Sequence, residues 1–152
     1  MTRFALAALL VGLLAAAGSA GGDKKAKGNE ADGDWIVVGM EQDGKKVPAE
    51  AVKKLEMKLS IKGATYTLTM AGELADKGTS VIDATKKPYA VDIKPTMGPH
   101  QGKTMLAIVE IADNSMKACY DMEGKSRPTA FATKEGSGHV LILYQRAPKN
   151  KE

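Results

Sequence analysis

Cysteine is almost absent from this chain of 152 residues. The single cysteine, Cys119, excludes a disulfide within the chain, so the folded state must depend on its packed core. Cys119 lies within Met116–Tyr120, a run typical of a strand, and no histidine or cluster of cations stands beside it. This setting favours a buried, unreactive thiol; a reactive or intermolecular cysteine is the alternative.

Histidine is nearly as scarce, and its placement argues against metal binding and catalysis. Neither His100 nor His139 has a histidine, cysteine or carboxylate at short ligand spacing, so we expect no metal site. No serine, threonine or cysteine stands beside a base in a recognisable catalytic pattern. We therefore expect no cofactor and no enzyme activity, unless folding brings distant residues together.

One segment, Gly98–Thr104, has the look of a phosphate-binding loop. That motif requires a glycine five positions before Gly102, and Met97 occupies this place. The segment also joins two expected strands, whereas a phosphate-binding loop leads into a helix. We interpret it as a hairpin loop.

Aromatic residues are few, and charges of one sign are not grouped. Trp, Tyr and Phe total seven residues, and the 22 basic residues are interspersed with 18 acidic ones. A nucleic-acid-binding surface needs a basic stripe with exposed aromatics, which the sequence lacks. We expect no nucleic-acid partner.

The longest apolar run is the 14-residue segment Phe4–Ala17, which follows Arg3 and precedes the small residues Gly18-Ser19-Ala20. This order is typical of a secretory signal, so we predict a signal peptide at residues 1–20 and an exported protein, periplasmic or extracellular. The run is shorter than the roughly 20 residues that span a bilayer as a helix. We expect no stable membrane span after cleavage; a short membrane anchor is the alternative.

The rest of the chain divides into three parts. Residues 21–32 contain no apolar residue larger than alanine and predict a flexible linker. Residues 33–146 predict one folded domain with a modest core. Residues 147–152 predict a disordered tail.

Alternation of apolar and polar residues predicts an all-β domain. Met57, Leu59 and Ile61 alternate with polar residues, and the pattern returns after a turn at Lys62-Gly63. The one expected helix is Pro48–Leu55. Strands are expected at Gly33–Val38, Met57–Lys62, Thr65–Met70, Gly78–Asp83, Tyr89–Lys94, Thr104–Ile111, Ser115–Asp121, Thr129–Thr133 and His139–Arg146.

This series of short strands allows a sandwich or an up-and-down barrel. Short turns between successive strands favour a small antiparallel barrel of about eight strands, because closure removes exposed edges. The first strand carries Gly33 and Trp35, and the last ends at Arg146. We expect these two strands to pair, with the Arg146 guanidinium on the Trp35 indole at the seam.

Several motifs resemble those of the uncharacterised lipocalin-like domain family expanded in planctomycete bacteria. They are Gly33-x-Trp35, Met40-Glu41-x-Asp43-Gly44-Lys45-x-Val47-Pro48, Asp83–Pro88, Gly102-Lys103-Thr104, Leu106–Glu110, Arg127–Phe131 and Gly136–His139. The resemblance covers nearly all of residues 33–146. It implies a small lipocalin-like barrel and an exported location, and it brings no established activity. It also implies a packing contact among Gly33, Trp35 and Arg146.

The inward-facing residues are the candidates for binding a ligand. They are Trp35, Met57, Leu59, Tyr66, Leu68, Met70, Val91, Met105 and Tyr144. About eight strands enclose either a packed core or room for one small ligand, and the shortness of the domain favours the packed core. The leading functional hypothesis is an exported barrel that binds a small apolar or amphipathic molecule. The alternative is a solid barrel that contacts another protein of the cell envelope.

Overall fold

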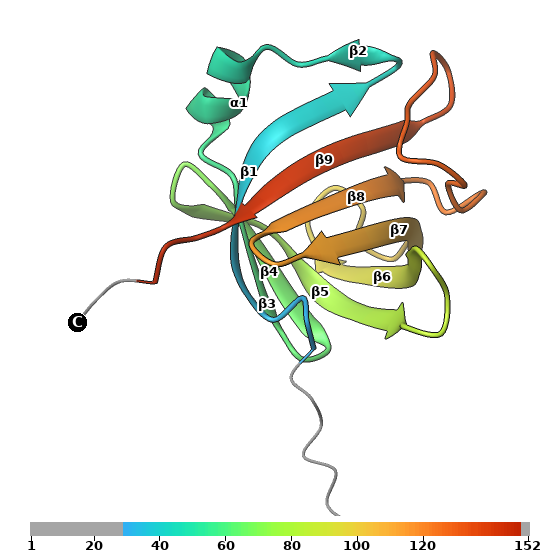
Figure 1. The fold of residues 1–152 in the computed structure, drawn as a ribbon, viewed down its shortest axis with the longest axis horizontal. Coiled ribbons are helices and arrows are strands. Elements are labelled where there is room, and N and C mark those ends of the chain that lie inside the picture. The colour runs from blue at the N-terminus through green and yellow to red at the C-terminus, as the bar shows by residue number, and fades with distance from the viewer. Residues whose placement is uncertain (1–28, 150–152) are drawn as a thin grey trace, which may run out of the picture.

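The predicted fold class is confirmed: the domain is a closed antiparallel barrel of eight strands, with one additional short strand and one short helix (Figure 1). The computed structural model describes residues 29–149, so the predicted signal peptide lies outside the described residues. The strands are β1 (Gly33–Gln42), β2 (Lys45–Lys46), β3 (Lys58–Lys62), β4 (Thr65–Met70), β5 (Glu73–Asp83), β6 (Tyr89–Met97), β7 (Met105–Ala112), β8 (Ser115–Asp121) and β9 (His139–Arg146), and α1 spans Ala49–Leu55.

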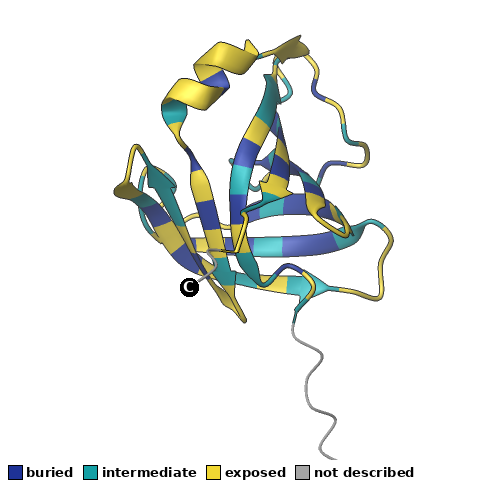
Figure 2. Ribbon diagram, turned by 60° about the vertical axis from the view of Figure 1, so that its left-hand side comes forward, coloured by how far each residue is buried: buried dark blue, intermediate teal, exposed yellow. Residues whose placement is uncertain are grey.

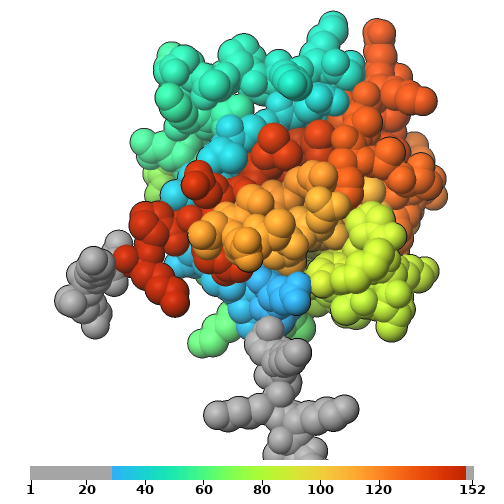
Figure 3. Space-filling model, in the orientation of Figure 1, coloured from blue at the N-terminus to red at the C-terminus, as the bar shows by residue number. Residues whose placement is uncertain are grey.

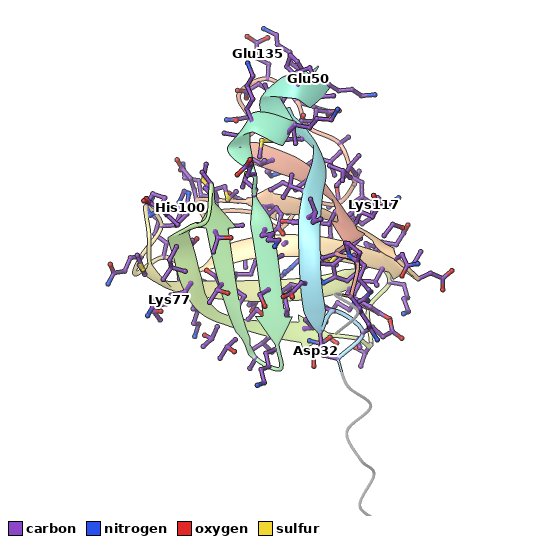
Figure 4. All side chains as sticks on the ribbon, turned by 90° about the vertical axis from the view of Figure 1, so that its left-hand side faces the viewer. Asp32, Glu50, Lys77, His100, Lys117 and Glu135 are labelled. Carbon is purple, nitrogen blue, oxygen red and sulfur yellow. The ribbon has the colours of Figure 1, made fainter. Side chains whose placement is uncertain are left out.

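Strands β3 to β8 each pair with the next strand along the chain, and β1 pairs with both β3 and β9. This last pairing closes the barrel. One end, which we call the seam end, carries residues 29–32 and the last residues of β9. The other, which we call the loop end, carries α1 and the segments 98–104 and 122–138. In Figure 4, Asp32 marks the seam end, and Glu50 and Glu135 mark the loop end.

Buried and exposed residues alternate along the strands (Figure 2). Leu59 pairs with Leu68 and Ile61 pairs with Tyr66, so these apolar side chains share the inner face. Lys58, Ser60 and Lys62, which alternate with Leu59 and Ile61 on β3, are exposed. The period of two that predicts strands therefore also places the core.

The predicted strand at Thr129–Thr133 is wrong: these residues belong to the irregular segment 122–138 between β8 and β9. This segment lies against the outside of the barrel beside β9 and β1 (Figure 3). The Thr133 amide and hydroxyl both donate to Glu41 Oε1 on β1, at 3.2 and 2.8 Å. A side chain remote in sequence thus takes the place of a strand partner.

Two more contacts hold the same segment. Arg127 Nη1 donates to the carbonyl oxygens of Val91 and Ala107, each at 2.8 Å. Cys119, fully buried on the outer face of β8, contacts the Ala132 carbonyl oxygen through its sulfur at 3.7 Å. Burial raises the pKa of the Cys119 thiol, as expected for an unreactive core cysteine.

Residues 29–32, the last four of the predicted linker, are described and contact the seam, whereas residues 21–28 lie outside the described residues. Ala31 is buried, and its carbonyl oxygen accepts a hydrogen bond of 2.8 Å from Trp35 Nε1. The low hydropathy of residues 21–32 gave no sign of this contact, because the acceptor is a backbone carbonyl oxygen that any residue could supply. At the other terminus, the Ala147 amide donates to the Asp34 carbonyl oxygen, and residues 150–152 of the predicted tail lie outside the described range.

The first and last strands meet at a seam built on Trp35 and Arg146. The two residues are directly paired across β1 and β9, and the Arg146 guanidinium lies 4.1 Å from the centre of the Trp35 ring. Arg146 also donates to the carbonyl oxygens of Asp32 and Glu30, at 2.8 and 3.1 Å. Gly33 has a φ of +123°, and a Cβ there would lie 2.9 Å from Arg146 Nη1, so only glycine leaves room for the guanidinium.

Truncation of Trp35 tests the seam. The side chain is fully buried, so Trp35→Ala removes a large apolar surface and one hydrogen bond. We expect a loss of about 3 to 5 kcal/mol in the free energy of unfolding, measured by urea denaturation. Val38→Ala, on the same strand but half exposed, is the control and should cost well under half as much. Equal losses would contradict the placement of the indole.

Arg146→Ala tests the cation that covers the indole. Loss of the ring contact and of two hydrogen bonds to carbonyl oxygens should lower the free energy of unfolding by about 2 kcal/mol. Arg146→Lys keeps the charge but lacks the planar group that reaches both carbonyls, so its loss should be intermediate. If lysine restored full stability, charge alone would account for the effect, and the bidentate geometry would be irrelevant.

Candidate functional site: a cavity inside the barrel

The barrel contains a cavity of about 250 Å³, partly open to solvent, that runs from the seam end to the loop end. Its wall is mostly apolar and comes from β3 to β9. The lining residues are Ala31, Leu59, Ile61, Tyr66, Leu68, Met70, Ala75, Asp76, Ser80, Ile82, Val91, Ile93, Pro99, His100, Met105, Val109, Met116, Tyr120, Met122, Ile142 and Tyr144. Inner residues such as Leu68, Met70 and Tyr120 are only partly buried, because they border this space and not a packed neighbour.

Seven of the nine predicted ligand-binding residues line the cavity: Leu59, Tyr66, Leu68, Met70, Val91, Met105 and Tyr144. Trp35 and Met57 do not. Trp35 is fully buried at the seam, where the Arg146 guanidinium lies over its ring and the Ala31 carbonyl oxygen accepts a hydrogen bond from its Nε1. Met57 is buried next to the end of α1 and packs in the core with Val52. Facing inward therefore does not by itself place a residue on the cavity wall.

An acidic residue, Asp76, lies on the cavity wall beside a β-bulge. Asp76 on β5 pairs with Leu68, but the next pair is Thr69 with Leu74, so Ala75 is an extra residue on β5. A bulge lets two successive residues turn to the same face, and Ala75 and Asp76 both line the cavity.

Sequence reasoning missed Asp76 because it placed the start of this strand at Gly78. The strand begins at Glu73, directly after the turn Ala71-Gly72, in which both residues have positive φ. The bulge interrupts the period of two, so alternation could not reveal these first residues as part of a strand. The Ala71-Gly72 turn after Met70 was the signal that could have found them.

Asp76 is 7% exposed, and its Oδ1 accepts a hydrogen bond of 3.3 Å from the Tyr66 hydroxyl. Burial raises the pKa of Asp76, although the Tyr66 hydroxyl acts in the opposite direction. The pKa of Tyr66 lies well above its usual range, because its hydroxyl is desolvated and faces the Asp76 carboxylate. The cavity thus holds a carboxyl group that pays a desolvation cost when it ionises.

A second polar pair lies on β8 and β9. The hydroxyls of Tyr120 and Tyr144 are 2.8 Å apart and form one hydrogen bond. Burial raises the pKa of Tyr120 to about 12 and raises that of Tyr144 as well, so both stay protonated at neutral pH. These two tyrosines supply neutral polar groups to an otherwise apolar wall.

The loop that joins β6 to β7 contributes Pro99 and His100 to the cavity. It connects two strands, as expected for a hairpin loop. Gly98 has a φ of +95°, and a Cβ there would lie 3.0 Å from the Ala75 carbonyl oxygen and 3.2 Å from Asp76 Oδ1. Glycine therefore allows the loop to approach the bulge, and this approach brings His100 to the cavity wall near Asp76.

His100 is another residue of this cavity that the sequence did not predict, and it has an unusual feature. Its Nδ1 is buried and has no hydrogen-bond partner among the described residues. Figure 4 shows His100 on the same side of the barrel as Lys77, the residue that follows Asp76 on β5. No sequence signal distinguishes His100 from a surface histidine, since its Nδ1 becomes buried only when the loop after β6 approaches the bulge on β5.

A second hollow, of about 520 Å³, lies outside the barrel between α1 and β1. It is lined by Ile36, Val37, Val38, Ala49, Val52, Lys53, Glu56, Met57, Lys58, Thr69 and Gly72. Its charged members Lys53, Glu56 and Lys58 are exposed to solvent. The wall of the barrel cavity is more apolar and has a few polar groups that converge on one side, so the barrel cavity is the better candidate for binding.

Comparison with models of known protein families and with curated proteins finds no match for this chain. The resemblance to the planctomycete lipocalin-like family therefore stays a prediction from motifs. Within residues 29–149, no helix combines the length and the apolar character that crossing a bilayer requires. The same residues contain no group of three or more His, Cys, Asp or Glu placed to hold a metal ion.

The raised pKa of Asp76 predicts a pH-dependent stability cost. The folded state holds the Asp76 proton more tightly than the unfolded state, so this residue lowers stability as pH rises from below its unfolded pKa to above its folded one. Asp76→Asn removes that cost and keeps an oxygen for Tyr66. We expect a higher melting temperature than the wild type at pH 7 and a smaller difference at pH 3.

Asp121→Asn is the matched control, with the opposite sign. Asp121 is also buried, but its carboxylate accepts the Glu123 and Ser126 amides, and despite burial its pKa is lowered. We expect this variant to be less stable than the wild type at pH 7. Destabilisation by Asp76→Asn at pH 7 would refute the desolvation cost.

Proposed function

We propose that this protein binds a small apolar or amphipathic molecule inside the barrel. The observation that carries the proposal is the cavity of about 250 Å³, whose wall is apolar apart from a few converging polar groups. Binding sites for small molecules have this character. A solid structural barrel would gain stability by filling such a space, since each buried gap costs packing energy.

The volume limits the size of the ligand. At about 30 Å³ for each water molecule, the cavity has room for about eight waters. A ligand of about eight to ten non-hydrogen atoms matches this space, and the volume falls below the roughly 300 Å³ at which drug-sized pockets begin. The partner we propose is accordingly smaller than a long-chain lipid.

The proposed location is outside the cytoplasm, periplasmic or extracellular. The support is the order of Arg3, the apolar run Phe4–Ala17 and the small residues after it. A barrel with a ligand cavity suits a protein that captures a molecule from the surrounding medium. Mass spectrometry of the protein from its own host would identify the first residue of the exported form.

A second candidate function is contact with an envelope protein through the outer face of β1 and β9. Val38 and Leu143 are 50% and 41% exposed, and Leu143 lies beside Gly39, where a Cβ would be only 3.0 Å from Leu143 Cδ1. These residues form a small apolar patch on paired strands. The patch is limited, and exposed apolar residues are common on protein surfaces, so the cavity remains the stronger basis for a function.

Ethylbenzene, which has about eight non-hydrogen atoms, is a suitable first probe for the cavity. We expect saturable chemical-shift changes at lining residues in nitrogen-15-labelled protein. Val91→Phe should fill the space and abolish these changes, whereas Val81→Phe should not, because Val81 is 69% exposed on the outer face. Val109→Phe is a second filling variant in case Val91→Phe does not fold.

Native mass spectrometry of protein purified from its own host complements this titration. We expect a small copurifying molecule that is absent from the Val91→Phe variant. If ethylbenzene caused no saturable change, or if Val81→Phe weakened binding as much as the filling variants, binding inside the barrel would be contradicted.

A further inference from the structure

The polar groups of the cavity gather on one side, where β4, β5 and the loop after β6 meet. Asp76, Tyr66 and His100 all line the cavity there. The remaining wall is apolar, apart from Ser80 and the Tyr120–Tyr144 pair. A ligand in this cavity therefore meets polar groups at one place and apolar side chains elsewhere.

The Asp76 carboxylate has no lysine or arginine partner in the cavity from residues 29–149; the nearby group that can carry a positive charge is His100, which acts to lower the pKa of Asp76 but does not offset the effect of burial. Among the described residues, no lysine or arginine side chain lines this space, and Asp76 takes part in no ion pair. Its one side-chain partner is the neutral Tyr66 hydroxyl. A buried carboxylate without a counter-ion is costly to maintain, and a bound cation would remove that cost.

His100 lines the same part of the wall. Its Nδ1 is buried and has no hydrogen-bond partner among the described residues, and this atom is not accessible from the cavity. The Tyr66 hydroxyl already donates a hydrogen bond to Asp76 Oδ1. An ionised carboxyl group only accepts hydrogen bonds, so the ligand group that matches Asp76 is a hydrogen-bond donor.

We propose that the ligand is a small primary amine whose ammonium group binds to the Asp76 carboxylate, on the side of the cavity that His100 also lines, with its apolar body in the barrel. An ammonium group has three donors and no acceptor, so it matches this set of groups. Its positive charge supplies the counter-ion that Asp76 lacks. This inference rests on the proposed function and names the ligand class for the same cavity.

The same arrangement disfavours an anionic ligand. The carboxylate of a fatty acid near Asp76 would place two like charges in a site of low polarity, and no lysine or arginine of the described residues lines the cavity to compensate. A neutral alcohol could donate one hydrogen bond but would leave the Asp76 charge unpaired. Amine, alcohol and hydrocarbon should therefore bind with clearly different affinities.

Three probes of nearly equal size separate these possibilities: benzylamine, benzyl alcohol and ethylbenzene. Calorimetric or NMR titration of the full domain at pH 7 should show that benzylamine binds at least about tenfold more tightly than either neutral probe. In Asp76→Asn, benzylamine should lose this advantage, while the affinity for ethylbenzene stays within about twofold of the wild type.

Glu73→Gln is the matched control, because Glu73 is an exposed carboxylate on the same strand. It should leave the affinities for all three probes unchanged, which separates a local contact from a general effect of charge. Asp76→Ala provides a second variant if Asp76→Asn does not fold. A thermal melt of each variant establishes that it is folded before titration.

The outcomes distinguish this inference from the proposed function. If ethylbenzene or benzyl alcohol binds as tightly as benzylamine, or if Asp76→Asn keeps the preference for the amine, the ammonium site is refuted and the apolar cavity stands. If none of the three probes binds, the proposed function fails and the ammonium site fails with it. Loss of the amine preference in Asp76→Asn but not in Glu73→Gln supports the assignment.

Discussion

Pairing of β1 with β9 is the constraint on which the rest of this structure depends. It joins the two ends of the domain, and the Arg146 guanidinium over the Trp35 indole holds the joint at the seam end. Without this pairing, β1 and β9 would each present a free edge, and the inner face would be open to water. Closure creates an interior, and residues 29–32 cover its end through hydrogen bonds to Trp35 and Arg146.

The interior is not completely filled, and its unfilled part has a definite chemistry. Flexible methionines such as Met70 and Met105 line it and can adapt to a ligand. Asp76 is maintained there although burial disfavours its charge. Proteins commonly retain such unfavourable groups at sites of function, where a ligand provides the missing interaction. The bulge at Ala75 and the glycine at position 98 bring Asp76 and His100 to one side of this space.

Much of the fold was predictable because its signals are local. The turn at Lys62-Gly63 and the alternation on both sides of it are confirmed as β3 and β4, and the helix is confirmed as α1. The failures involve residues whose partners are remote in sequence. Thr129–Thr133 has strand-like composition but bonds to Glu41, and the bulge hides the start of β5 because it breaks the period of two. Seven of the nine predicted wall residues line the cavity, since alternation places side chains on the inner face.

The amino-acid pattern alone is enough to predict an antiparallel barrel, its approximate strands and the side chains that point inward, because each depends on neighbours a few positions apart. Whether those side chains fill the interior or leave a cavity depends on volumes contributed by seven strands, and only the folded chain decides it. The same holds for the polar groups. Asp76 and His100 stand 24 positions apart and become neighbours through the pairing of β5 with β6 and the close approach at Gly98. Contacts between such distant positions do not produce a periodic pattern in the sequence, so the sequence alone does not predict them.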